Sequence, residues 1–282
     1  MINKLRNYLL DLRDRQQMAI ALAKGGAMMR NRSIDLKNPA TWEFSGFSQN
    51  GEDGVLDVLR KQLTNTNRYF VEIGSADGMQ NNSSWLVVAE QYAGLMVEGN
   101  PELLNRAKRL IPHYSIGAEC VNMFVNAASI RDLRSLALYS DPDVFSLDID
   151  GVDYYVAKAV FEAGFRPKIF VVEYNSVFGP DRCMTVPYKE NFSFGIEHST
   201  RLYYGVSVSA WRKLFAKHGY RFVTVDSKGV NAFFVEPSSF DASFLDAVVG
   251  VPFNENLYQF RKFRGNFAEQ FKLIADQRFF DV

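Results

Sequence analysis

The chain has 282 residues, of which 47% are hydrophobic and 23% are charged, a composition typical of a globular protein. Its 32 basic and 32 acidic residues give a formal net charge of zero, which argues against a protein that binds nucleic acid through a basic surface. No stretch approaches the roughly 18 apolar residues of a membrane-spanning helix, and charged residues around positions 11 to 15 interrupt the apolar region that a signal peptide would need.

The first 45 residues are expected to form a helix and a linker. Apolar residues recur at helical spacing over residues 2–30, which predicts one amphipathic helix that ends near a pair of glycines. Residues 31–46 are polar and irregular and are expected to be the linker. The charges of the helix are mixed in sign, which favours packing or a homo-oligomer through this helix over attachment to a membrane surface.

Residues 46–237 are expected to form the main domain, because short apolar runs alternate there with helical patterns. Strands are predicted at residues 68–73, 94–98, 120–125, 144–149 and 168–174. Helices are predicted at residues 50–63, 81–91, 101–110, 129–138 and 153–164. Continuous apolar strands separated by helices indicate parallel strands buried on both faces, joined by right-handed crossovers.

The pattern changes after the fifth strand. Residues 176–204 are rich in glycine, proline and aromatic residues without a clear period, and we expect this insertion to cover the substrate. A loop that packs its own aromatic residues is the alternative. A helix at residues 206–218 and strands at 219–225 and 229–235 follow, and the two strands predict an antiparallel hairpin. The expected fold is therefore α/β and Rossmann-like, with a mainly parallel seven-stranded sheet, helices on both faces and a terminal hairpin. Residues 238–282 are expected to be a helical extension.

The first predicted strand leads into a turn with the sequence FVEIGSADGMQNNSS, residues 70–84. In doubly wound sheets such a turn holds the ligand, and Gly74 and Gly78 permit close approach of the backbone. A dinucleotide is disfavoured, because the middle glycine of its fingerprint is missing and its pyrophosphate would lie beside Glu72 and Asp77. S-adenosylmethionine carries a sulfonium and an ammonium group, so it suits an acidic turn. Solvated acids at the start of a helix are the structural alternative.

A further acid, Glu98, ends the second strand. A carboxylate in this position can accept hydrogen bonds from both ribose hydroxyls of an adenosine. Because NAD sites use the same feature, Glu98 favours S-adenosylmethionine only in combination with the acidic first turn.

Several motifs together resemble the class I methyltransferases, and the FkbM-type family in particular. The matching stretches are FSQNGEDGVL (47–56), FVEIGSADG (70–78), GLMVEGNP (94–101), FSLDIDGVDYYV (145–156) and VVEYNSVFGP (171–180). The resemblance implies an S-adenosylmethionine-dependent O-methyltransferase, with Gln49 and Asp53 at the methionine end of the cofactor. The cofactor-binding residues expected on this basis are Gln49, Asp53, Glu72, Gly74, Asp77, Gly78, Glu98, Asn126 and Asp148.

Polar residues also end the fourth and fifth strands. Asp148 and Asp150 follow the fourth strand, and Glu173 and Asn175 end the fifth. Carboxylate and amide oxygens suit Mg²⁺, so Asp148, Glu173 and Asn175 are candidate metal ligands. The arrangement is similar to that of catechol O-methyltransferase and the macrocin-type sugar methyltransferases, although here Tyr174 separates the last two ligands. The alternative is that Asp148 contacts the cofactor or substrate while Glu173 and Asn175 bind the acceptor by hydrogen bonds.

A sugar hydroxyl is a weak nucleophile at neutral pH, so a base or a metal ion is expected to help. Among three histidines, His198 lies in the segment expected to cover the substrate and is a candidate base, although a surface position is an alternative. Asp148 and Asp150 are the other catalytic candidates.

By analogy with the FkbM-type and macrocin-type enzymes, we expect an O-methyltransferase that acts on a sugar hydroxyl of a glycan or a glycosylated small molecule, with S-adenosylmethionine and Mg²⁺ as the expected cofactors. The alternatives are an NAD(P)-dependent oxidoreductase or epimerase and a non-catalytic module that binds an adenosine ligand. Cys120 and Cys183 show neither metal-ligand spacing nor a disulfide framework, and free thiols favour a reducing, cytoplasmic location.

Overall fold

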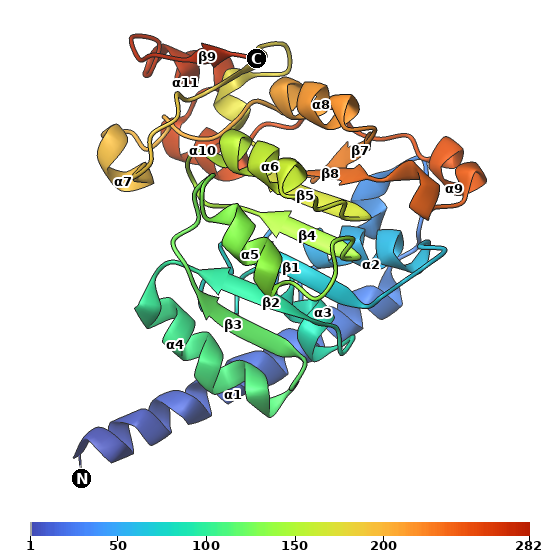
Figure 1. Ribbon diagram of the computed structural model, residues 1–282, viewed down its shortest axis with the longest axis vertical. Helices are drawn as coiled ribbons and strands as arrows, with labels where there is room; N and C mark the ends of the chain where they lie inside the picture. The colour runs from blue at the N-terminus through green and yellow to red at the C-terminus, as the bar shows by residue number, and fades with distance from the viewer. Residues whose placement is uncertain (1) are drawn as a thin grey trace.

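A seven-stranded sheet forms the centre of the protein (Figure 1). The computed structural model describes the backbone of residues 2–282 and the side chains of residues 9–282. The strand order is β3-β2-β1-β4-β5-β8-β7. The strands are β1 (Tyr69–Ile73), β2 (Ala93–Glu98), β3 (Ala118–Asn122), β4 (Val144–Leu147), β5 (Ile169–Glu173), β7 (Arg221–Val225) and β8 (Asn231–Val235). Strands β1 to β5 are parallel, and β8 is antiparallel to both of its neighbours, which confirms the predicted sheet with a terminal hairpin.

Helices cover both faces of the sheet, as the alternating pattern predicted. Figure 1 shows α5 (Ile130–Leu136), α6 (Asp153–Glu162) and α8 (Val208–Lys217) in front of the sheet. The opposite face is covered by α1 (Ile2–Asn31), α2 (Glu52–Lys61), α3 (Ser84–Val88) and α4 (Pro101–Leu110). Short 3₁₀ helices lie at Pro39–Trp42, Ile111–His113, Ser176–Phe178 and Pro237–Ser239.

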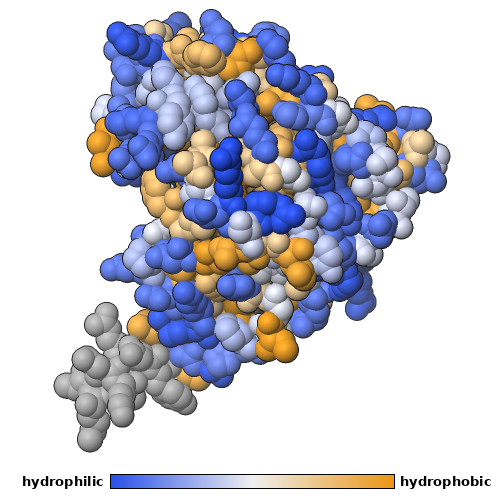
Figure 2. Space-filling model, in the orientation of Figure 1, coloured by the Kyte–Doolittle hydropathy of each residue, from blue (hydrophilic) through white to orange (hydrophobic). Residues whose placement is uncertain are grey.

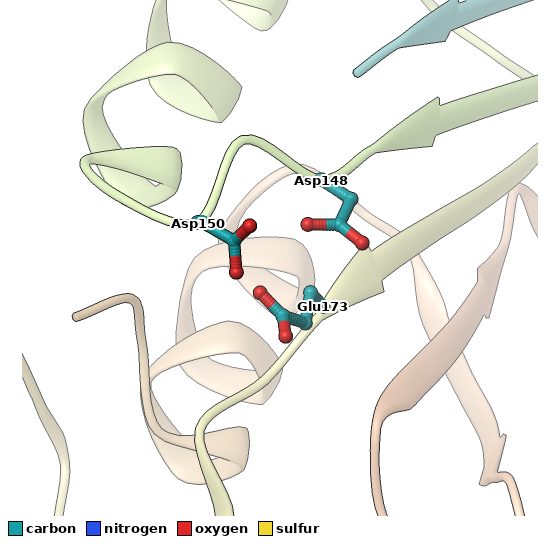
Figure 3. Close-up of side chains that lie close together, drawn as sticks. All are labelled: Asp148, Asp150 and Glu173. Carbon is teal, nitrogen blue, oxygen red and sulfur yellow. The ribbon is translucent and has the colours of Figure 1, made fainter. Parts of the chain in front are cut away.

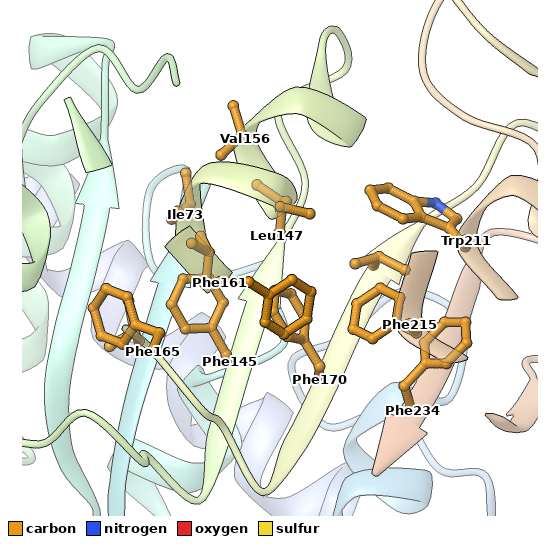
Figure 4. Close-up of a cluster of buried hydrophobic side chains, with 14 of the residues drawn as sticks. Ile73, Phe145, Leu147, Val156, Phe161, Phe165, Phe170, Trp211, Phe215 and Phe234 are labelled. Carbon is orange, nitrogen blue, oxygen red and sulfur yellow. The ribbon is translucent and has the colours of Figure 1, made fainter. Parts of the chain in front are cut away.

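Alternation along each strand divides the core between these two faces. In β1, Val71 and Ile73 pack against α5 and α6, whereas Phe70 packs on the side of α2 and α3. The front core is largely aromatic, and Figure 4 shows Phe145 and Phe170 among its members. The same alternation directs the polar residues at the carboxyl ends of β1, β2, β4 and β5 toward the α2 side of the sheet.

Two segments differ from their predicted ranges for identifiable reasons. Strand β3 covers residues 118–122 because these pair with Gly94–Glu98, and residues 123–125 run past the end of the sheet. Helix α3 is shorter than predicted because the preceding turn is held by two other hydrogen bonds: the Asn81 side chain donates to the carbonyl oxygen of Ser75, and the backbone N–H of Asn82 donates to the Glu72 carboxylate. The expected linker is irregular, yet its Trp42 and Phe44 are almost fully buried in the core behind the sheet. No helix within residues 2–282 is long and apolar enough to cross a membrane.

The insertion and the C-terminal extension pack on each other. They contain α7 (Phe194–Glu197), α9 (Ala242–Ala247), α10 (Leu257–Phe263) and α11 (Phe267–Lys272). Strands β6 (Met184–Thr185) and β9 (Phe280–Asp281) join the two segments in a small antiparallel sheet. Phe178 and Leu202 of the insertion share a core with Ile274 of the extension, so much of the insertion is packed and not a free loop.

Candidate functional site

A cavity of about 1320 Å³ opens at the carboxyl ends of β1, β2, β4 and β5. Its walls come from the turns after these strands, from the start of α2 and from α10. In Figure 1 these strands end at the left, so the cavity lies at that edge, whereas the hydrophilic side chains across the middle of Figure 2 belong to the face that α5 and α6 cover. This is the edge at which an α/β sheet of this type binds its ligand.

Glu98 lies in this cavity at the end of β2 in a fixed orientation. Its Oε2 accepts a hydrogen bond from the backbone N–H of Ala76 at 2.9 Å, and its Oε1 accepts one from the N–H of Asn100 at 2.7 Å. A carboxylate has about four lone-pair sites, so about two remain for ligand hydroxyls. The acid that the sequence assigned to a ribose is therefore preorganised to accept two hydrogen bonds.

The glycine turn after β1 passes close to the end of β4. Gly74 has a φ of +86°, and a Cβ atom at this position would lie 1.7 Å from the carbonyl oxygen of Asp148. Only glycine fits there, and Gly74 and Asp148 both line the cavity.

Glu72 also lines the cavity, but its carboxylate is used to build the turn. Its Oε1 accepts a hydrogen bond from the N–H of Asn82 at 2.8 Å, and its Oε2 accepts one from the Ser83 hydroxyl. Burial raises the pKa of Glu72 to about 7. Glu72 thus shapes the floor of the cavity at the start of α3.

At the start of α2, Glu52 lines the cavity in place of the predicted Asp53. Gln49 lines the cavity, but Asp53 does not, because its Oδ2 accepts hydrogen bonds from three backbone N–H groups of residues 46–48. Adjacent residues on a helix point about 100° apart, and Glu52 faces the cavity instead. Glu52 is buried and accepts hydrogen bonds from the Asn50 and Asn231 side chains.

Three other predicted cofactor residues lie outside the cavity wall. Asp77 pairs with Arg106, which also binds Asp14 and so ties α4 to α1. Gly78 has a φ of +77° and packs near α4. Asn126 accepts hydrogen bonds from two backbone N–H groups at the start of α5. All three organise the local backbone, and we do not include them among the residues proposed to contact the cofactor.

Three carboxylates converge in the centre of the cavity (Figure 3). Each of Asp148, Asp150 and Glu173 offers an oxygen, and these oxygens lie within 4.8 Å of one another. Loss of hydration and the neighbouring carboxylates raise the pKa values of Asp148 and Glu173 well above their usual range. Such a group is stable only if it shares a proton or binds a cation, and three carboxylate oxygens suit a hard divalent ion.

Asn175, predicted as the third metal ligand, does not belong to this group. Its Nδ2 donates hydrogen bonds to the carbonyl oxygens of Leu202 and Tyr204, and its Oδ1 accepts one from the N–H of Val177. Asn175 therefore clamps the insertion onto the end of β5. In the carboxylate group its place is taken by Asp150, which was predicted as a catalytic acid or base.

His198 is also outside the cavity wall. It follows α7, is half-buried, and its Nδ1 lies 2.8 Å from the Thr200 hydroxyl oxygen. The insertion reaches the cavity through Glu190 and Phe192 instead. Of the predicted catalytic residues, Asp148 and Asp150 therefore line the cavity and His198 does not.

Two further contacts hold this carboxylate group in place. Asp153, at the first turn of α6, accepts hydrogen bonds from the N–H groups of Ile149 and Gly151 and so shapes the turn that carries Asp150. The Tyr204 hydroxyl lies 3.3 Å from the Oε1 of Glu173 and receives a hydrogen bond from Gln259 of α10.

Sequence reasoning missed the wall formed by the hairpin and the extension. Lys228 and Asn231 from the β7–β8 hairpin line the cavity together with Tyr258 and Arg261 of α10. Asn231 pairs with Glu173 across the strands, its Nδ2 donates to Glu52, and its buried Oδ1 has no partner among the described residues. The predicted hairpin was the only sequence signal for this wall. Because β8 runs antiparallel beside β5, it starts at the edge of the sheet where β5 ends and the ligand is expected.

The chain shows only distant similarity to proteins of known structure. No family model and no curated protein matches the chain. Among solved structures, an O-methyltransferase from Bacillus cereus in complex with SAH is 14% identical with a TM-score of 0.43, covering 78% of this chain and 89% of that one. The O-methyltransferase TomG from Streptomyces achromogenes is 15% identical, with a TM-score of 0.41 and coverage of 76% and 87%. The SAH-bound methyltransferase PaMTH1 from Podospora anserina is 12% identical, with a TM-score of 0.44 and coverage of 74% and 92%. Each TM-score is below 0.5, so these similarities carry no argument about substrate or activity.

Proposed function

We propose that the protein is an S-adenosylmethionine-dependent O-methyltransferase of the FkbM type that methylates a sugar hydroxyl. The observation that carries the proposal is Glu98, held by two backbone N–H groups at the end of β2 with lone pairs free toward the cavity. A diol donor such as a ribose fits this arrangement. The choice of the FkbM type rests on the sequence motifs, and the choice of a sugar rests on analogy with FkbM-type and macrocin-type enzymes.

The charge of the cavity supports a cationic cofactor. Eight acidic side chains line the cavity, namely Glu52, Glu72, Glu98, Glu102, Asp148, Asp150, Glu173 and Glu190. The basic side chains of the wall are Lys228 and Arg261. A pyrophosphate at the first turn would face Glu72 and Asp148, whereas a sulfonium and an ammonium group would be attracted to them. This favours S-adenosylmethionine over NAD(P).

The reaction requires an oxygen nucleophile in line with the methyl–sulfur bond. With the ribose at Glu98, the sulfonium lies one methylene group away and thus toward the ends of β1 and β4. Asp148 and Glu173 then lie beside the incoming hydroxyl, and either carboxylate can accept its proton as the new carbon–oxygen bond forms. Phe192 and Leu257 from the insertion and from α10 limit the access of water.

A hard divalent cation fits the three carboxylate oxygens, and we include it in the proposal. Asp148, Asp150 and Glu173 would hold it, and its charge would lower the pKa of a bound hydroxyl. The same ligands serve as proton acceptors when no ion is bound, so a chelator separates the two routes.

Isothermal titration calorimetry tests the cofactor directly. The protein should bind S-adenosylhomocysteine, and NAD⁺ should give no heat under the same conditions. Binding of NAD⁺ without binding of S-adenosylhomocysteine would refute the proposal. Activity is then measured as release of S-adenosylhomocysteine in the presence of hydroxyl-bearing sugars.

A further inference from the structure

We propose that Lys228 and Arg261 form an anion-binding subsite at the acceptor end of the cavity, so that the acceptor is an acidic hydroxyl compound. This inference rests on the proposed function and adds the class of substrate: a sugar or similar molecule that carries a phosphate, sulfate or carboxylate group.

The position of the two cations along the sheet carries the argument. Neighbouring strands lie about 4.8 Å apart, so the end of β4 is about 10 Å from that of β2, and the start of β8 is about 19 Å from it. A cofactor whose ribose lies at Glu98 has its sulfonium near β4. The region beyond β5, at the start of β8, is therefore left for the acceptor.

Lys228 and Arg261 are held close to each other in that region. The N–H of Leu257, the first residue of α10, donates to the carbonyl oxygen of Lys228 at 2.9 Å. Arg261 follows Leu257 by four residues and so lies on the same side of the helix, and all three residues line the cavity. The same end of α10 is fixed by its N-cap residue Asn256, whose N–H donates to the Ser176 hydroxyl at 2.9 Å.

Both cations are available to a ligand. Their side chains are exposed at the rim, and neither forms a salt bridge within residues 9–282. Glu43 lies near enough to interact electrostatically with Lys228, but its carboxylate is already bound by the N–H and hydroxyl of Ser227.

The two ends of this region have opposite charge, which would orient the acceptor. Carboxylates of Asp148 and Glu173 lie deep in the cavity and attract a hydroxyl donor, whereas the cations lie at the rim. Asn231 pairs with Glu173 across the strands and also lines the cavity, so β8 connects the carboxylate end of this region to the hairpin that carries Lys228. A neutral sugar would satisfy the inner groups only. An acidic sugar would satisfy both ends, with Tyr258 at the rim available to stack on its ring.

The test is calorimetric titration of the protein saturated with S-adenosylhomocysteine, with inorganic phosphate and D-glucuronate as probes and D-glucose as the neutral reference. Phosphate and glucuronate should bind, and Arg261→Gln together with Lys228→Gln should weaken them about tenfold or more. Lys272→Gln on α11 is the matched control, because this exposed lysine does not line the cavity. It should leave both affinities unchanged.

Three results would overturn the inference: neither anion binds, the control weakens binding as much as the double variant, or phosphate displaces S-adenosylhomocysteine. The last would assign the cations to the methionine carboxylate, and the double variant would then bind S-adenosylhomocysteine more weakly while binding 5′-methylthioadenosine normally. If the wild-type protein binds no S-adenosylhomocysteine, the proposed function fails, whereas anion titration of the free protein still tests the subsite.

Discussion

Replacement of Glu98 by glutamine should weaken cofactor binding by a predictable amount. The two carboxylate oxygens accept hydrogen bonds from the N–H groups of Ala76 and Asn100, at 2.9 and 2.7 Å, and their remaining lone pairs face the cavity. In Glu98→Gln one oxygen becomes an NH₂ group, which opposes one of these N–H donors and offers no acceptor to a ribose hydroxyl. Loss of one hydrogen bond to a charged group costs about 1.5–3 kcal/mol, or roughly 10- to 150-fold in Kd.

Calorimetry with S-adenosylhomocysteine and its 2′-deoxyribose analogue separates a ribose contact from a disturbed turn. The wild-type protein should prefer the ribose ligand by a similar factor, and Glu98→Gln should largely remove that preference. Glu119→Gln on β3, an exposed acid outside the cavity wall, is the matched control. Equal weakening of both ligands by Glu98→Gln would show that the variant acts on the turn, and the ribose assignment would be abandoned.

Asp77→Asn should lower the free energy of unfolding, measured by urea denaturation, by about 1–2 kcal/mol, because Arg106 loses an ion pair. The variant should leave the Kd of S-adenosylhomocysteine unchanged, and a large change in this Kd would contradict the placement of Asp77 outside the cavity. Because burial raises the pKa of Glu72 from 4.5 to about 7, its contribution to stability is present below pH 4.5 and is lost as the pH rises through 7. Glu72→Gln should therefore show a smaller fall in stability over this interval, and an unchanged pH profile would count against the raised pKa. Asp148→Asn should abolish methyl transfer, and EDTA should stop the wild-type reaction; full turnover in chelator would exclude the divalent ion and leave the carboxylates as the proton acceptors. Limited proteolysis should cut first within residues 187–201, which carry several exposed side chains, and an acceptor should protect them; cleavage elsewhere, unaffected by acceptor, would contradict a covering role.

The sheet and its acidic edge could be predicted because both depend on short-range patterns. Parallel strands buried on both faces appear as continuous apolar runs, and their carboxyl ends meet at one edge. The strand register places Glu98, Asp148 and Glu173 at one level and Glu72 two residues before that level, so simple alternation brings all four to the same face of the sheet. All four line the cavity.

Predictions outside the strands were less successful, because loops and helix starts lack such a constraint. At the start of α2, Glu52 and Asp53 are both acidic, and only the helix rotation decides which of them faces the cavity. Asn175 is a suitable metal ligand by chemistry, yet the insertion uses all its hydrogen-bonding groups. The contribution of α10 depends on packing between segments far apart in the sequence, which a local pattern does not contain.

The division of the cavity between early and late parts of the chain has an evolutionary consequence. Groups proposed for the cofactor fall within residues 49–148, and those proposed for the acceptor, apart from Asp148 and Asp150, begin with Glu173 and continue to Arg261. One genetic crossover between these stretches would exchange the acceptor wall and keep the cofactor half intact. The main requirement on the new partner would be a fifth strand that pairs with Val144–Leu147 in the same register. New acceptors could thus be acquired in one step, without passing through an enzyme that has lost its methyl donor.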